Sequence, residues 1–164
     1  NIELKQAKQK TTSESRLSLL DTDMGTDEVG KFWHKGQHWS SAGVPAIYAG
    51  LLLEIAAMEK LVHTGSILPL NLVVVSQNDL PDDNNLYEIP LLDALPGDWS
   101  TLPGSLTAVA YGNSFIHKGK HLGLNTLGNN SEASNIVLNP NHSIMKEVTI
   151  EIIRDFIFDT GLQP

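Results

Sequence analysis

Apolar and polar positions alternate in short runs along most of the chain, and two stretches keep an apolar face for the length of a helix. Short apolar or alternating runs bounded by turn residues indicate β-strands, and a 3.6-residue apolar period indicates a helix. Strands are predicted over Arg16–Leu20, Val44–Tyr48, Leu70–Val75, Leu86–Ile89, Leu122–Leu127, Ile136–Leu138 and Val148–Phe158. Helices are predicted over Leu51–His63 and Ser105–Ile116, and a loop rich in proline and glycine over Leu95–Gly104.

This balance of elements predicts a mixed α/β fold, of the α+β kind, in which a few helices flank a mixed sheet. With 164 residues, of which 41% are hydrophobic, the chain is expected to build one core. Residues 1–15 are polar and are predicted to form an N-terminal arm, so that residues 16–164 make a single domain.

Composition narrows the classes of function. A formal net charge of −8 argues against direct binding of nucleic acid, because that affinity comes mainly from clustered Lys and Arg. No apolar run approaches the roughly 18 residues that a membrane span needs, and no signal peptide is evident. The chain has no cysteine, which excludes a disulfide scaffold and a thiol nucleophile and fits a cytoplasmic location.

One acidic residue lies within an apolar stripe of the first predicted helix. Glu59 follows the same period as four apolar residues, Leu52, Ile55, Ala56 and Val62. Burial of an ionised carboxylate costs several kcal/mol unless it is paired or faces a wet cleft. Glu59 is therefore either a functional residue or the partner of His63, four residues on, whereas Glu54 is expected to be exposed.

Two histidine pairs share the form His-Lys-Gly-x-His, at His34 and His38 and at His117 and His121. Histidines four residues apart can bind zinc on a helix, but the central glycines argue against a helix at both places. No metal site is predicted. The chain has no Gly-x-Ser-x-Gly elbow, P-loop or Gly-x-Gly-x-x-Gly motif, and Ser105 is expected to cap the second helix.

Four phrases in order resemble the RES family: KGQHWSSAGVPAIY at 35–48, the helix with Glu59 and LVH ending at His63, LPGDW at 95–99, and NIVLNPNH at 135–142. The resemblance implies a fold related to ADP-ribosyltransferases and an activity that cleaves NAD, as substrate, at the nicotinamide–ribose bond. It also implies a toxin neutralised by an Xre-type antitoxin as partner.

The resemblance assigns roles to particular residues. Glu59 would stabilise positive charge on the ribose or activate an acceptor, and Tyr48 would stack on the nicotinamide. Arg16 matches the early arginine of the family and would hold a phosphate. Thr126 and Asn139 are also expected to bind NAD.

The chain departs from the family at two positions. The second arginine of the family is His38 here, and no serine aligns with the family's serine, so that Thr126 or Ser131 would substitute. Diphtheria-type ADP-ribosyltransferases use His, Tyr and Glu, and His38, Tyr48 and Glu59 occur in that order. We therefore expect His38 to take the place of the arginine by hydrogen-bonding the ribose.

Two other classes of function remain open. The same substitutions fit a catalytically inactive RES-like domain that serves as a protein-binding module. A metal-dependent hydrolase that uses the histidine pairs is the third class. The sequence leaves open whether the chain forms a homo-oligomer.

Overall fold

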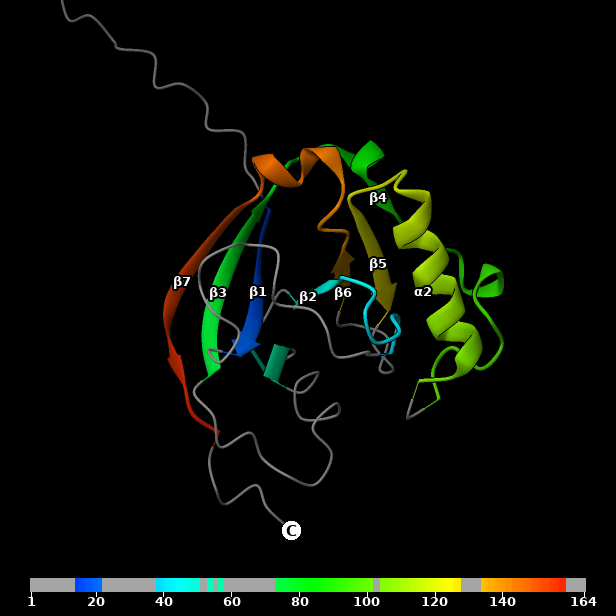
Figure 1. The fold of residues 1–164 in the computed structure, drawn as a ribbon, viewed down its shortest axis with the longest axis horizontal. Coiled ribbons are helices and arrows are strands. Elements are labelled where there is room, and N and C mark those ends of the chain that lie inside the picture. Colours follow the sequence, from blue (N-terminus) through cyan, green and yellow to red (C-terminus); the bar gives the residue numbers. More distant parts are fainter. Residues whose placement is uncertain are drawn as a thin grey trace, which may run out of the picture.

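The computed structural model describes residues 14–21, 38–50, 53–54, 56–57, 73–101, 104–127 and 134–158. Within these ranges the strands are β1 (Glu14–Asp21), β2 (Ile47–Gly50), β3 (Val73–Leu80), β4 (Tyr87–Glu88), β5 (Gly123–Leu127), β6 (Ser134–Leu138) and β7 (Thr149–Phe156) (Figure 1). The same ranges contain helix α2 (Leu106–Lys118) and three 3-10 helices, Asn84–Leu86, Leu92–Ala94 and Ser143–Glu147.

The described strands form one seven-stranded sheet in the order β4-β5-β6-β2-β1-β3-β7. Neighbouring strands are antiparallel except β4 and β5, which run parallel. The two halves of the sheet meet where Leu17 of β1 pairs with Gly50 of β2. Figure 1 shows α2 beside the β5 half of the sheet. The predicted mixed α/β class is confirmed.

The β2, β5 and β6 strands bury side chains on both faces of the sheet, because successive residues point to opposite sides. One face carries a core of Ile47, Ala49, Leu80, Leu122, Ile136, Leu138 and Met145. The other packs Leu124 and Val137, with Tyr48 at its margin, against Trp39, Ala46, Leu95, Ala108, Phe115 and Ile116. The second face is the one that α2 covers, and it carries the residues of interest.

Helix α2 begins and ends at local signals that the sequence contains. The Ser105 hydroxyl accepts a hydrogen bond of 3.0 Å from the Ala108 backbone N–H, a cap that typically stabilises a helix by about 1 kcal/mol. Gly119 ends the helix in the left-handed conformation, with φ at 59°, where a side chain would be strained. The predicted helix Ser105–Ile116 is confirmed, with two more residues at its end.

Strand β2 begins three residues later than predicted. The predicted strand starts at Val44, but Val44 donates its N–H to the Ser41 carbonyl over 3.1 Å and closes a turn. Gly43 in that turn has a φ of 85°, and Pro45 has no N–H to offer to a sheet. Pairing with β6 therefore starts only at Ile47.

Strand β3 extends past the apolar run that predicted it. The prediction ends at Val75, whereas the strand continues through polar residues 76–79 to Leu80. Because β3 lies between β1 and β7, its backbone groups are paired on both sides, and the polar stretch follows the ladder. Of the predicted helix Leu51–His63, residues 53–54 and 56–57 are helical, Glu54 is exposed as expected, and the others lie outside the described residues.

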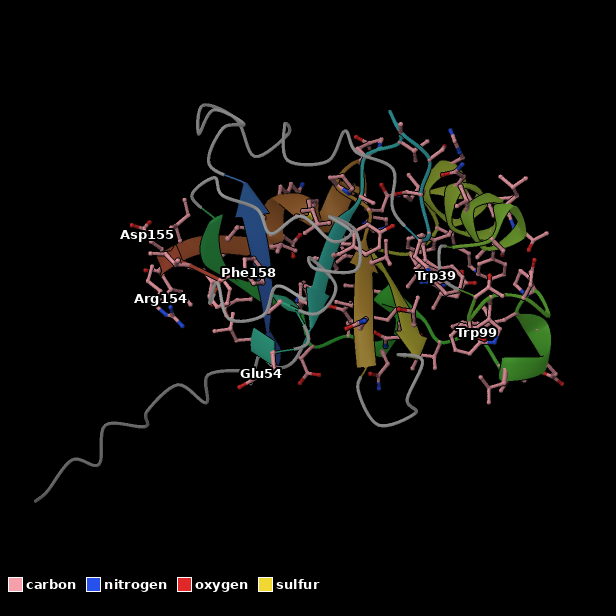
Figure 2. The ribbon with its side chains drawn as sticks, turned by 90° about the horizontal axis from the view of Figure 1, so that it is seen from below. Trp39, Glu54, Trp99, Arg154, Asp155 and Phe158 are labelled. Carbon is pink, nitrogen blue, oxygen red and sulfur yellow. The ribbon has the colours of Figure 1, made fainter. Side chains whose placement is uncertain are left out.

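Strand β7 forms an edge of the described sheet and is exposed on both faces. Ile152 and Ile153 are each 50% exposed, and the register with β3 shifts between Val75 and Ser76, as at a β-bulge. Arg154 and Asp155 project outward next to this irregularity (Figure 2). A bulge and charged residues on an edge discourage pairing with other chains. None of the helices that the structure describes is long and apolar enough to cross a membrane.

Candidate functional site

The segment from His38 to Pro45 runs along α2 and closely approaches two glycines, Gly112 within the helix and Gly104 just before it. A Cβ atom on Gly112 would lie 1.9 Å from the Trp39 carbonyl oxygen, and one on Gly104 would lie 2.8 Å from the His38 Cα. Real Cβ atoms essentially never come within 3.0 Å of another heavy atom in this way. Both positions therefore require glycine for the segment to lie where it does.

An amide on α2 fixes the middle of this segment. The Asn113 Oδ1 accepts a hydrogen bond of 3.1 Å from the Ser41 N–H, and the Asn113 Nδ2 donates one of 2.8 Å to the Ser41 Oγ. Each such bond contributes about 0.5–1.5 kcal/mol. The pair holds the backbone at Ser41 in register with the helix.

The Tyr48 hydroxyl holds the same segment from the sheet. It accepts a hydrogen bond of 3.2 Å from the Trp39 N–H and lies 3.0 Å from the Ser40 Oγ. Tyr48 pairs with Val137 of β6, which fixes its place on the face that α2 covers. The structure thus brings Tyr48 into contact with the residues that directly follow His38.

An aromatic cluster lies between the segment and the loop before α2. The rings of Trp39 and Trp99 stack at 6.3 Å with an angle of 22°, and Tyr111 meets Trp39 edge-on at 6.1 Å. Figure 2 shows Trp39 and Trp99 together beside α2, at the opposite side of the molecule from Arg154. Pairs of this kind contribute about 0.5–1.5 kcal/mol beyond area burial.

The His38 ring packs against this cluster and bonds to its loop. Its centroid lies 5.2 Å from that of Trp39, and its Nε2 hydrogen-bonds the Trp99 carbonyl oxygen. The ring is half-buried, and the structure gives its Nδ1 no hydrogen bond with the described residues. His38 is thus fixed by a residue 61 positions away in the sequence.

A polar group of three residues anchors the cluster to the sheet edge. The Tyr111 hydroxyl donates to the Glu88 Oε1 over 2.8 Å, and the His121 Nδ1 lies 3.3 Å from the Glu88 Oε2 without hydrogen-bond alignment. Burial, together with the bond and the charge of Glu88, raises the pKa of Tyr111 to about 12. Tyr111 therefore stays protonated and continues to donate across the ordinary pH range.

Thr126 lies on the same face of the sheet as Tyr48. It pairs with Asn135 of β6, one row along the sheet from the pairing of Tyr48 with Val137. Thr126 is 3% exposed, and its hydroxyl donates to the Asn135 carbonyl over 3.4 Å. The role of Thr126 in binding NAD stays a prediction.

Asn139 lies elsewhere, at the C-terminal end of α2, and its amide serves the fold. Its Nδ2 donates to the Ile116 carbonyl over 3.0 Å, and its Oδ1 accepts from the Asn141 N–H over 3.0 Å. It is 1% exposed and borders a hollow of about 340 Å³. The hollow is also lined by Gly43, Val44, Pro45, Ile116, His117, Gly119 and Asn141, and includes neither His38 nor Tyr48.

Two of the predicted residues lie outside the described part of the chain, and of a third only the backbone is described. Glu59 and Ser131 lie outside the described residues. The backbone of Arg16 is described and lies on β1, next to the Leu17–Gly50 pairing that joins β1 to the end of β2, but its side chain is not described. The roles of Arg16 and Glu59 stay predictions.

The central glycine of the second histidine pair predicts that the two histidines do not share one helix, and the structure agrees. His117 is in the last turn of α2 and its Nδ1 bonds the Asn113 carbonyl over 2.7 Å, whereas His121 follows Gly119 and faces Glu88. Among the described side chains, no group of three or more His, Asp or Glu is arranged to hold a metal ion.

Sequence reasoning missed Asn113, Gly112 and Glu88. A glycine within a helical pattern usually has a packing reason, so Gly112 carried a usable signal. Asn113 and Glu88 carried none, because their partners Ser41 and Tyr111 are distant in the sequence.

Comparison with known proteins decides the family. Residues 25–159 match the RES domain. The chain belongs to the RES family. A protein named "Toxin Res" from Photorhabdus laumondii is 29% identical to this chain over 89 residues, which cover 54% of this chain and 56% of that protein. A protein named "Prs ADP-ribosylating toxin" from Sphingobium sp. is 27% identical over 127 residues, or 76% of this chain and 78% of that protein.

The match to the RES family covers both the fold and the segment that contains His38. The family match spans most of the described sheet and α2, including the segment that holds His38. His38, which the sequence analysis expects to take the place of an arginine of the family, lies where that segment meets Trp99.

Proposed function

We propose that this RES-family protein is a toxin that cleaves NAD at the bond between nicotinamide and ribose, and that a cognate Xre-type antitoxin neutralises it. The observation that carries the proposal is the contact of the Tyr48 hydroxyl with Trp39 and Ser40, the two residues that directly follow His38. The names of the two relatives, one a toxin and one an ADP-ribosylating toxin, support the same function.

The proposed reaction breaks the C–N bond between ribose and nicotinamide. Nicotinamide leaves with the bonding electron pair, and the ribose passes through an oxocarbenium-like state that water or an acceptor on another molecule then captures. Capture by water degrades NAD, and capture by a protein transfers ADP-ribose. A carboxylate near the ribose lowers the barrier because it stabilises the positive charge, and this is the role proposed for Glu59.

The other residues bind and orient NAD in this proposal. The Tyr48 hydroxyl accepts from the Trp39 N–H and lies 3.0 Å from the Ser40 Oγ, which fixes the position of the ring that we propose to stack on nicotinamide. His38 bonds the ribose, and Arg16 holds a phosphate through its guanidinium group. Thr126 is the remaining residue proposed to contact NAD, whereas the Asn139 amide is bonded within the fold.

Release of nicotinamide from NAD tests the proposal, with two variants on the same predicted helix. Wild-type protein and the Glu54→Gln variant should release nicotinamide at the same rate, because Glu54 is exposed. The Glu59→Gln variant should release it at least about a hundredfold more slowly, the usual cost of losing one electrostatic contact to the transition state. Equal and negligible release from all three would refute the enzymatic function.

A second candidate is a catalytically inactive RES-like domain that binds a protein partner. The replacement of the family's arginine by His38 favours it, because an arginine grips phosphate with charge-assisted bonds that a neutral histidine does not make. Titration of NAD into the protein by calorimetry separates the two candidates. Heat of binding supports the enzyme, and its absence supports the module.

A further inference from the structure

The hydrogen bond between His38 and Trp99 determines which ring nitrogen of His38 carries a proton. A backbone carbonyl oxygen can only accept, so the Nε2 that contacts the Trp99 carbonyl must be the donor. In a neutral imidazole the other nitrogen is then a bare acceptor. No hydrogen bond joins the Nδ1 of His38 to any of the residues that the structure describes, so none of these residues occupies its lone pair.

The carbonyl that selects this state is held firmly. The Trp99 N–H donates to the Pro96 carbonyl over 2.9 Å, and the Thr101 N–H donates to the Asp98 carbonyl over 3.1 Å, so the chain around Trp99 is a pair of closed turns. The Trp99 ring stacks on Trp39, the neighbour of His38. The donor and the acceptor are therefore positioned by the same aromatic cluster.

Glycine at position 104 is also needed for His38 to lie where it does. A Cβ atom on Gly104 would lie 2.8 Å from the His38 Cα, 3.0 Å from its carbonyl oxygen and 3.1 Å from its Cγ. Any side chain at position 104 would therefore displace His38, and glycine at this position leaves the backbone and ring of His38 where they are. The position of His38 thus depends on its bond to Trp99 and on the absence of a side chain at position 104.

We propose that the Trp99 carbonyl holds His38 in the tautomer protonated at Nε2, and that Nδ1 accepts a hydrogen bond from a hydroxyl of the ligand's sugar. This inference rests on the proposed function for the identity of the ligand. In this tautomer His38 accepts a hydrogen bond and therefore selects a ligand hydroxyl that donates one. An arginine at this position would only donate and would favour an anion. Trp99 is then a positioning residue that acts through its backbone.

Two other histidines provide internal references for the proposed tautomer. The His117 Nδ1 bonds the Asn113 carbonyl and must be protonated at that nitrogen when neutral. The His142 Nδ1 accepts from the Ile144 N–H over 3.2 Å and must be bare, like that of His38. We therefore expect His38 and His142 to show one tautomer and His117 to show the other.

Long-range 1H–15N spectra of protein labelled in its histidines distinguish the tautomers, in buffer in which these side chains are neutral. The expected result is a protonated Nε2 and a bare Nδ1 for His38, and the reverse for His117. Protonation of His38 at Nδ1 would overturn the proposal. The resonances are assigned with the His38→Gln and His117→Gln variants.

Two probes then test what the bare nitrogen accepts. ADP-ribose carries sugar hydroxyls and should move the His38 Nδ1 resonance upfield, as a new hydrogen bond does, whereas inorganic pyrophosphate carries only the anionic part and should leave it unchanged. The His38→Gln variant keeps a donor for the Trp99 carbonyl but lacks Nδ1, so it should bind ADP-ribose about five- to tenfold more weakly. The matched His117→Gln variant should bind as the wild type does.

These results separate the failure of this inference from that of the proposed function. Release of nicotinamide measured on the same sample, with no shift of Nδ1 on addition of ADP-ribose, would overturn the inference and leave the reaction standing. A shift of Nδ1 without release of nicotinamide would support the inference and refute cleavage.

Discussion

Replacement of Gly112 by alanine should detach the His38–Ser41 segment from α2. The new Cβ atom would lie 1.9 Å from the Trp39 carbonyl oxygen and 2.7 Å from its carbonyl carbon. To restore an acceptable contact, helix and segment must separate by about 1 Å, and both neighbours are backbone with no flexible end to yield.

The expected change in the free energy of unfolding combines two losses with one gain. Overpacking of this kind typically costs about 1–3 kcal/mol, and displacement of Ser41 from Asn113 weakens two hydrogen bonds worth about 0.5–1.5 kcal/mol each. Alanine in a helix interior returns about 1 kcal/mol relative to glycine. We therefore expect the Gly112→Ala variant to lose about 1–3 kcal/mol in its free energy of unfolding.

Urea denaturation followed by circular dichroism and tryptophan fluorescence measures this loss. The fluorescence of folded protein should also change, because the contact of Trp39 with Trp99 and Tyr111 shifts with the segment. Ser114→Ala, an exposed substitution two residues along the same helix, is the control and should stay within about 0.5 kcal/mol of wild type. A Gly112→Ala variant about 1 kcal/mol more stable than wild type, with unchanged emission, would show that the close approach does not exist.

Two more substitutions test the contacts around the same segment. Asn113→Leu removes both bonds to Ser41 and should lower the free energy of unfolding in urea by about 1–3 kcal/mol. Asn113→Asp can still accept from the N–H and the hydroxyl of Ser41, so its loss should be less than half as large. Equal losses in the two variants would contradict these contacts. The pKa of Tyr111 is about 12 in the folded protein, against an ordinary value of about 10 in the unfolded chain. Between these two values the unfolded chain has lost the proton and the folded protein has kept it, so the free energy of unfolding falls as pH rises. Between pH about 9 and 11 the free energy of unfolding should fall more steeply in wild type than in Tyr111→Phe, and parallel slopes would refute the raised pKa.

The parts of the fold that the sequence predicted are those with local causes. Helix α2 was predictable because its cap at Ser105, its apolar period and its final glycine at Gly119 all act within a few residues. The start of β2 was mistaken because the apolar run includes Val44, which the turn at Gly43 and the missing N–H of Pro45 keep out of the sheet. The far end of β3 was missed because strands on both sides stabilise residues whose side chains do not favour a strand.

The candidate site shows the same limit. His38 and Tyr48 were predicted as a pair, and the structure joins them through the Trp39 N–H and Ser40. The partners that fix His38 were not predictable, since Trp99 lies 61 residues away and Asn113 lies 72 residues from Ser41. A short sequence pattern carries no information on such contacts, because they depend on how the loop before α2 folds back.

The identity of the products formed from NAD is the measurement that bears most directly on the proposed reaction. Chromatography of NAD incubated with the protein should show one nicotinamide for each NAD consumed, with neither AMP nor nicotinamide mononucleotide, because the proposed bond to break is the one between nicotinamide and ribose. AMP together with nicotinamide mononucleotide would mean that the pyrophosphate is cleaved instead. That result, or NAD that remains intact, would contradict the function proposed for this RES-family protein.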